Sequence, residues 1–152
     1  MNYYFLAFIL LLASCQDNLE SRYQEALSYK EKKEYRDSNI ILNDIINSPE
    51  SSQDLKTKSH FLLAQIFYDL RNYEASILSY KNILNEPLES PIRKKALFMI
   101  AYTYFNDLDM YSHSARFYNM FIEQYPNDEL VDAVNFELEQ INDIVNNKLK
   151  EE

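Results

Sequence analysis

Apolar residues recur at steps of three and four along most of this chain, which is the spacing of one face of an α-helix. Phe61, Ala64 and Phe67 form one such stripe, and Tyr73 and Ile77 begin another after a short polar turn. The polar turn between the two stripes is so short that the second helix must run back antiparallel to the first. The strict alternation that marks β-strands is absent from the letters. The pattern therefore predicts helical hairpins.

The hairpin pattern occurs three times, and matching positions are offset by 38 residues from Ala26 to Ala64 and by 37 from Ala64 to Ala101. Each copy also has a small residue on its second helix, where two helices would cross closely. These residues are Ser38, Ser76 and Ser114. One residue is added in the turn before Tyr111. A fixed period of this length indicates a stack of helical hairpins.

The periodicity and the end signals together predict seven helices. Pro49, Pro87 and Pro126 each follow a second helix, where proline can no longer continue it, and Ser90-Pro91 reads as a helix start. The chain has no glycine, so we expect Asn, Asp and Ser in its turns. The predicted helices span 18–32, 34–48, 53–69, 72–85, 91–106, 111–125 and 129–149. The last has an apolar stripe from Leu130 to Leu149 and is expected to cap the stack.

This pattern resembles the tetratricopeptide repeat. The matching positions in the second copy are Leu63, Ala64, Phe67, Tyr73, Ser76, Tyr80 and Pro87. The resemblance implies an all-α fold: an α-solenoid of three tetratricopeptide-like helical hairpins plus a C-terminal capping helix. The expected repeat domain is 18–150, with repeats at about 18–49, 53–87 and 91–126 and the cap at 129–149.

The N-terminus reads as a secretory signal that ends at a cysteine. Residues 3–13 are apolar without a break, which is too short to span a bilayer as a helix. The run ends in Leu12-Ala13-Ser14-Cys15, which is similar to a bacterial lipobox. The resemblance implies a signal at 1–14, a lipid-modified Cys15 that carries palmitate-type acyl chains, and a linker at 15–17. Gln16 follows the cysteine, and by analogy with enteric bacteria this favours the periplasmic face of the outer membrane.

The charge of the chain bears on its partners. The net charge is −9, and nine acids and two lysines fall between Glu123 and Glu152. An acidic chain of this kind argues against nucleic-acid binding, which needs a basic surface. The acidic C-terminal segment is interpreted either as a solvated helix face or as a docking surface for a basic partner.

The family resemblance also implies a binding groove along the first helix of each repeat. Carried onto this chain, the groove residues are Tyr23, Lys30, Lys58, Phe61, Gln65, Tyr68, Lys95, Phe98, Tyr102, Phe105 and Asn106. Aromatic side chains of this kind are common at recognition surfaces. An equally weighted alternative is that several of them pack against neighbouring helices. Such a groove would suit a client peptide with apolar side chains and a carboxylate.

Nothing in the letters indicates an enzyme or a cofactor. His60 and His113 lack a partner at metal-ligand spacing and are interpreted as surface histidines. Asp128, Glu129 and Asp132 are interpreted as parts of a solvated face, as are Glu137 and Glu139. We therefore expect no catalytic residue, no metal, no cofactor and no small-molecule substrate.

A closer resemblance concerns the segment from Phe117 to Pro126, which reads FYNMFIEQYP. Together with the lipobox and the period near 38, it resembles the tetratricopeptide lipoproteins that serve as the D subunit of the outer-membrane β-barrel assembly machinery. Those proteins have about five repeats. The resemblance implies a lipid-anchored scaffold that binds client proteins during barrel assembly. The alternatives are adaptors of other envelope machines, namely Tol-Pal-linked coordination of cell-wall synthesis, secretion or gliding.

Overall fold

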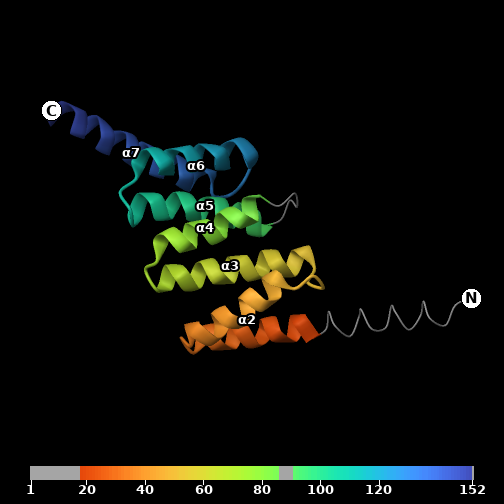
Figure 1. The fold of residues 1–152 in the computed structure, drawn as a ribbon. Helices are drawn as coiled ribbons and strands as arrows, with labels where there is room; N and C mark the ends of the chain where they lie inside the picture. Colours follow the sequence, from red (N-terminus) through yellow and green to blue (C-terminus); the bar gives the residue numbers. More distant parts are fainter. Residues whose placement is uncertain (1–17, 86–90, 152) are drawn as a thin grey trace, which may run out of the picture. The chain divides into compact units, whose positions relative to one another are not determined.

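The computed structural model describes residues 18–85 and 91–151, and these ranges contain helices and turns but no strand. The all-α fold class is thereby confirmed. A first helix spans 18–31. It is followed by α2 (Tyr35–Asn47), α3 (Gln53–Asp69), α4 (Tyr73–Leu84), α5 (Pro91–Asn106), α6 (Tyr111–Gln124) and α7 (Val131–Glu151). The order of the helices, and the packing of α2 on α3 and of α5 on α4 and α6, are those of tetratricopeptide-like hairpins (Figure 1). The signal at 1–14, Cys15, the linker and Pro87 lie outside the described residues.

The helix ends follow the predicted signals with one exception. The hydroxyl of Ser52 accepts a hydrogen bond from the backbone N–H of Leu55 at 3.2 Å and caps α3. Pro91 is the first residue of α5, as the sequence predicted. The last helix begins at Val131, two residues later than 129. The reason is that Asp128 holds a turn, because its carboxylate accepts from the backbone N–H of Leu130 at 3.0 Å.

The turns between paired helices do not always place one of the expected residues at their left-handed position. Each has one residue in the left-handed region: Lys33 at φ 61°, Arg71 at φ 58° and Asp109 at φ 53°. Only the third belongs to the expected set of Asn, Asp and Ser. The chain has no glycine for these positions, although glycine would adopt the conformation without strain. The backbone hydrogen bonds of the turn fix it, as in the bond from Asn72 N to Phe67 O at 2.8 Å.

The chain divides into two compact units, residues 1–72 and 73–152. In the first unit, the first helix and α3 pack against α2 around a core that includes Ala26, Leu42 and Ile66, which are all fully buried. Ser38 on α2 donates a hydrogen bond from its hydroxyl to the carbonyl oxygen of Ala26 at 2.7 Å. The two small residues therefore bring the helices close and also bond them.

The second unit contains α4 to α7, and α5 packs against both α4 and α6. The Ser–Ala hydrogen bond of the first unit has a counterpart here, because the hydroxyl of Ser114 donates to the carbonyl oxygen of Ala101 at 2.8 Å. α7 packs on α6 and buries Val134 and Ile141. The far end of the predicted apolar stripe is not covered, since Leu149 is 67% exposed. The capping stripe is therefore shorter than predicted.

Candidate interaction surfaces

Six predicted groove residues lie in the first unit, and all six are half-buried. They are Tyr23 and Lys30 on the first helix, with Lys58, Phe61, Gln65 and Tyr68 on α3. Tyr23 packs against the buried residues of the core with part of its ring. Burial raises the pKa of its hydroxyl, with Lys58 acting in the opposite direction. Tyr23 is therefore partly a core residue, in line with the alternative of packing.

The two lysines of this set have carboxylate partners in their own unit. Lys58 lies 2.7 Å from Asp54, and Lys30 lies 3.9 Å from Asp69. Tyr35 donates its hydroxyl proton to the same Asp69 at 3.4 Å. A peptide carboxylate at this surface would have to displace these partners. The structure therefore favours apolar over ionic contacts here.

The other predicted groove residues lie on α5 in the second unit, where Lys95 and Asn106 are exposed and the three aromatic residues are half-buried. Phe98 stacks on Tyr102 with ring centroids 6.3 Å apart and meets Phe121 of α6 edge-on at the same distance. Phe105 meets Tyr111 at 5.9 Å. One part of each ring is therefore in contact with another aromatic ring of this unit. Since these rings are only half-buried, the rest of their surface is open to solvent.

A buried tyrosine of α6 packs against these aromatic residues of α5. Tyr118 on α6 is fully buried, and its ring meets Phe98 at 5.8 Å. Burial raises the pKa of its hydroxyl, and the nearby Glu137 carboxylate adds to the increase. Desolvation also raises the pKa of Glu137. Glu137 is half-buried, so its assignment to a solvated helix face was wrong, whereas Glu139 is exposed as expected.

Asp128 was also expected on a solvated face, and this too was wrong. Its carboxylate forms a close ion pair with Lys94 of α5, in addition to its bond to Leu130 N–H. The hydrogen bond from Lys94 lowers the pKa of Asp128 and raises that of Lys94. The pair ties the start of α5 to the turn before α7.

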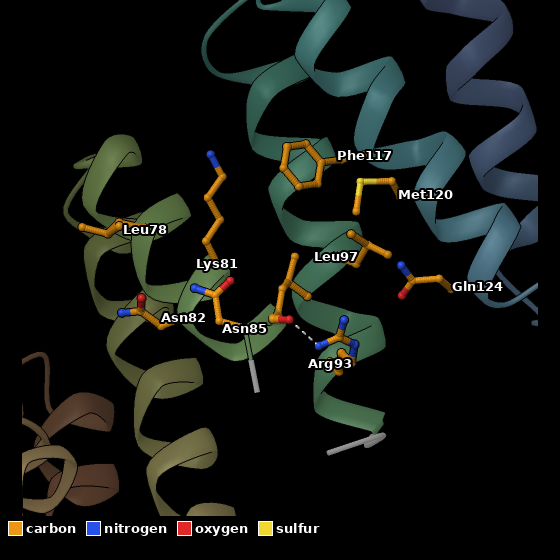
Figure 2. A pocket seen from close by; sticks show the side chains of 10 residues that line it. Leu78, Lys81, Asn82, Asn85, Arg93, Leu97, Phe117, Met120 and Gln124 are labelled. Carbon is orange, nitrogen blue, oxygen red and sulfur yellow. Dashed lines mark hydrogen bonds between the residues drawn. The ribbon is translucent and has the colours of Figure 1, made fainter. Parts of the chain in front are cut away.

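The sequence analysis did not predict a hollow that lies between α4, α5 and α6, with a cavity volume of about 400 Å³. We call it the α4–α6 hollow. Figure 2 shows that its wall comes from three helices. α4 supplies Leu78, Lys81 and Asn82, followed by Leu84 and Asn85; α5 supplies Arg93 and Leu97; α6 supplies Phe117, Met120 and Gln124. Within each helix the lining residues recur at steps of three or four, which is the signal that could have indicated a shared face.

The two histidines lie in different units, His60 in the first and His113 in the second. His60 lies in the middle of α3 and is half-buried, not on the surface as expected. His113 is exposed in the first turn of α6, with its ring 5.1 Å from that of Tyr104. Within residues 18–85 and 91–151, no group of three or more His, Cys, Asp or Glu side chains could hold a metal ion. In the same ranges, no helix has the length and apolar character needed to cross a membrane.

The chain was compared with known proteins. A family model described as the tetratricopeptide repeat matches residues 95–128, which cover most of α5 and all of α6. No curated protein matches the chain.

Proposed function

We propose that this chain, which carries a tetratricopeptide repeat at residues 95–128, is a lipid-anchored periplasmic scaffold for outer-membrane β-barrel assembly. Tetratricopeptide repeats bind protein partners, and the chain is a protein-interaction scaffold. The observation that carries the proposal is the open aromatic surface of α5. Phe98 and Tyr102 stack there at 6.3 Å, half-buried, and the exposed Lys95 lies on the same helix. This surface suits an apolar segment of a client protein.

The lipid anchor is supported by the N-terminal letters. Leu12-Ala13-Ser14-Cys15 is similar to a lipobox, and Cys15 is the single cysteine of the chain. Two or three acyl chains would hold the protein stably at a membrane, whereas one chain gives only marginal binding. With Gln16 after the cysteine, we place the anchor in the outer membrane, on its periplasmic face.

The role in barrel assembly is supported by the resemblance of the segment from Phe117 to Pro126, together with the lipobox. In the structure, Phe117, Tyr118 and Phe121 of this segment are buried. The segment therefore stabilises the third hairpin, and client binding falls to the exposed residues around it.

A photo-crosslinking experiment tests this function. p-Benzoylphenylalanine replaces Tyr102 in one variant and the exposed Asn119 of α6 in a matched control. After irradiation of intact envelopes, we expect the Tyr102 variant to cross-link to the barrel subunit of the assembly machinery or to nascent outer-membrane barrels. The control should not. Cross-links to peptidoglycan-associated or secretion proteins would instead assign the chain to another envelope machine.

The anchor has its own test. The substitution Cys15→Ala removes the sulfur that would carry the lipid, so we expect the protein to leave the membrane fraction. Fractionation of envelopes followed by immunoblotting measures this, with Ser14→Ala as the control that keeps the cysteine. If Cys15→Ala stays in the membrane fraction, the protein is not held by a lipid on Cys15.

A further inference from the structure

The α4–α6 hollow has an apolar floor and a fixed cation. Leu97 and Phe117 form the floor, and Leu78 stands at the rim with 62% of its surface exposed (Figure 2). Lys81 donates a hydrogen bond to the hydroxyl of Tyr104 at 3.0 Å. Its ammonium also lies 5.4 Å from the ring centroids of Tyr104 and of Phe117. These contacts hold the positive charge at the edge of an apolar cavity.

No carboxylate is present among the ten residues that line this hollow. The remaining polar groups are amides and Arg93, which donates to the carbonyl oxygen of Leu84 at 2.6 Å. A smaller neighbouring hollow of about 310 Å³ shares Leu78 and Lys81 and adds Glu74. In a chain with a net charge of −9, a hollow whose described lining holds no acid is suited to a partner that brings carboxylates beside an apolar side chain.

The outer face of α7 has this chemistry. Phe136 is 59% exposed and lies two residues from the buried Val134, about 200° around the helix. The exposed Asp132 and Glu139 precede and follow Phe136 by four and three residues, so they lie on the same face. Asp143 continues that face one turn further. Phe136 is thus an exposed aromatic side chain with carboxylates on both sides of it along the helix.

We propose that the α4–α6 hollow binds the outer face of α7 of a second copy of this chain. Phe136 enters the hollow above Leu97 and Phe117, and Asp132 or Glu139 meets Lys81. The volume of about 400 Å³ is sufficient for an aromatic side chain, since ligand pockets of about 300–1,000 Å³ accept larger groups. The hollow and the helix are different surfaces, so a single contact leaves one hollow and one α7 face free, and copies can join head to tail or close as a reciprocal pair.

Sedimentation velocity of the purified full chain, from micromolar to roughly millimolar concentration, tests the proposal. We expect reversible association that weakens by about tenfold or more in Phe136→Ala, which loses the inserted ring. Gln124→Glu should weaken it similarly, because it adds a carboxylate to the hollow at an exposed position. Leu149→Ala and Asn119→Glu are the matched controls, since both residues are exposed and lie outside the hollow and the acidic face. Circular dichroism melts verify that all four variants remain folded.

A mixing experiment distinguishes this contact from one in which a surface binds its own counterpart on the second copy. Phe136→Ala keeps an intact hollow, and Gln124→Glu keeps an intact α7. Mixed in equal amounts, the two should form one-to-one pairs at concentrations at which neither variant associates with itself. A wild-type chain that is monomeric at the highest concentration overturns the proposal. So does association that the Phe136 and Gln124 variants leave unchanged, or a mixture that stays monomeric.

Discussion

At the scale of single residues, the recurring Ala and Ser do more than leave space. Ser38 and Ser114 each donate a hydrogen bond to the carbonyl of the Ala that they face, at 2.7 and 2.8 Å. Both hydroxyls are fully buried, so each bond also removes the cost of an unsatisfied buried polar group. This explains why Ser38 and Ser114 are serines and not alanines.

The bond can be tested at Ser114. The substitution Ser114→Ala keeps the small size of the side chain but removes the donor, and we expect it to destabilise the fold by about 0.5–1.5 kcal/mol. Chemical denaturation measures the free energy of unfolding. Ser112→Ala on the exposed face of the same helix is the control. Equal stability of the two variants would show that the hydrogen bond contributes nothing.

The ion pair of Lys94 and Asp128 makes stability depend on pH. The folded pKa of Asp128 is lowered below its usual value of 3.8, mainly by the hydrogen bond from Lys94. Its contribution is therefore present above the unfolded pKa and is lost as the pH falls through the lower folded value. We expect Asp128→Asn to be less stable than wild type near neutral pH, with a gap that closes below about pH 4.

Thermal melts from pH 2 to pH 8 measure this gap, and Glu129→Gln on the exposed neighbour serves as the control. The same contact raises the pKa of Lys94 above 10.5. The contribution of Lys94 to the free energy of unfolding is therefore fully present below pH 10.5 and is lost only at more alkaline pH. A gap that stays constant down to pH 2 would mean that the pair does not stabilise the folded state.

At the scale of elements, the turn between paired helices is the least regular part of each hairpin. Lys33, Arg71 and Asp109 occupy the left-handed region, where a β-carbon is unfavourable by about 1–2 kcal/mol per residue. The conformation persists because the turn's backbone hydrogen bonds, such as Arg71 N to Tyr68 O at 2.8 Å, require it.

Glycine should relieve this strain. We expect Arg71→Gly to stabilise the protein by about 0.5–1 kcal/mol, after allowance for the greater entropy of glycine in the unfolded chain. Arg71→Ala is the matched control, because it removes the same side chain but keeps the β-carbon. If both variants change the midpoint of urea unfolding equally, then the left-handed backbone is not the source of the strain.

At the scale of the whole molecule, the chain has two compact units, each with its own packing. In arrays of hairpins, stability is carried largely by contacts between sequential neighbours. Ala101 is fully buried and accepts the bond from Ser114. Ala101→Leu should overpack this crossing and destabilise it by about 1–3 kcal/mol.

Hydrogen exchange followed by mass spectrometry locates the effect. We expect Ala101→Leu to reduce protection in α5 and α6, while the first helix and α2 keep theirs. Ala133→Leu on the exposed face of α7 is the control. A uniform loss of protection across residues 18–124 would show instead that the two units unfold as one.

The two surfaces of the second unit have different chemistry. The aromatic residues of α5 are half-buried beside the exposed Lys95, whereas the α4–α6 hollow holds Lys81 above an apolar floor. Phe98 and Tyr102 were predicted from the family resemblance, and their use by a partner stays a prediction. The hollow was not predicted, because its residues come from three helices whose packing brings them together.

The letters were sufficient to predict the helices and most of their ends. These depend on local spacing, on proline and on the repeated Ala and Ser, which act within one hairpin. The tertiary structure decided what depends on distant groups. Asp128 meets Lys94, Glu137 is desolvated beside Tyr118, and the end of α7 remains uncovered. The physical reason is that burial and charge pairing depend on neighbours in space, which the letters of one helix do not specify.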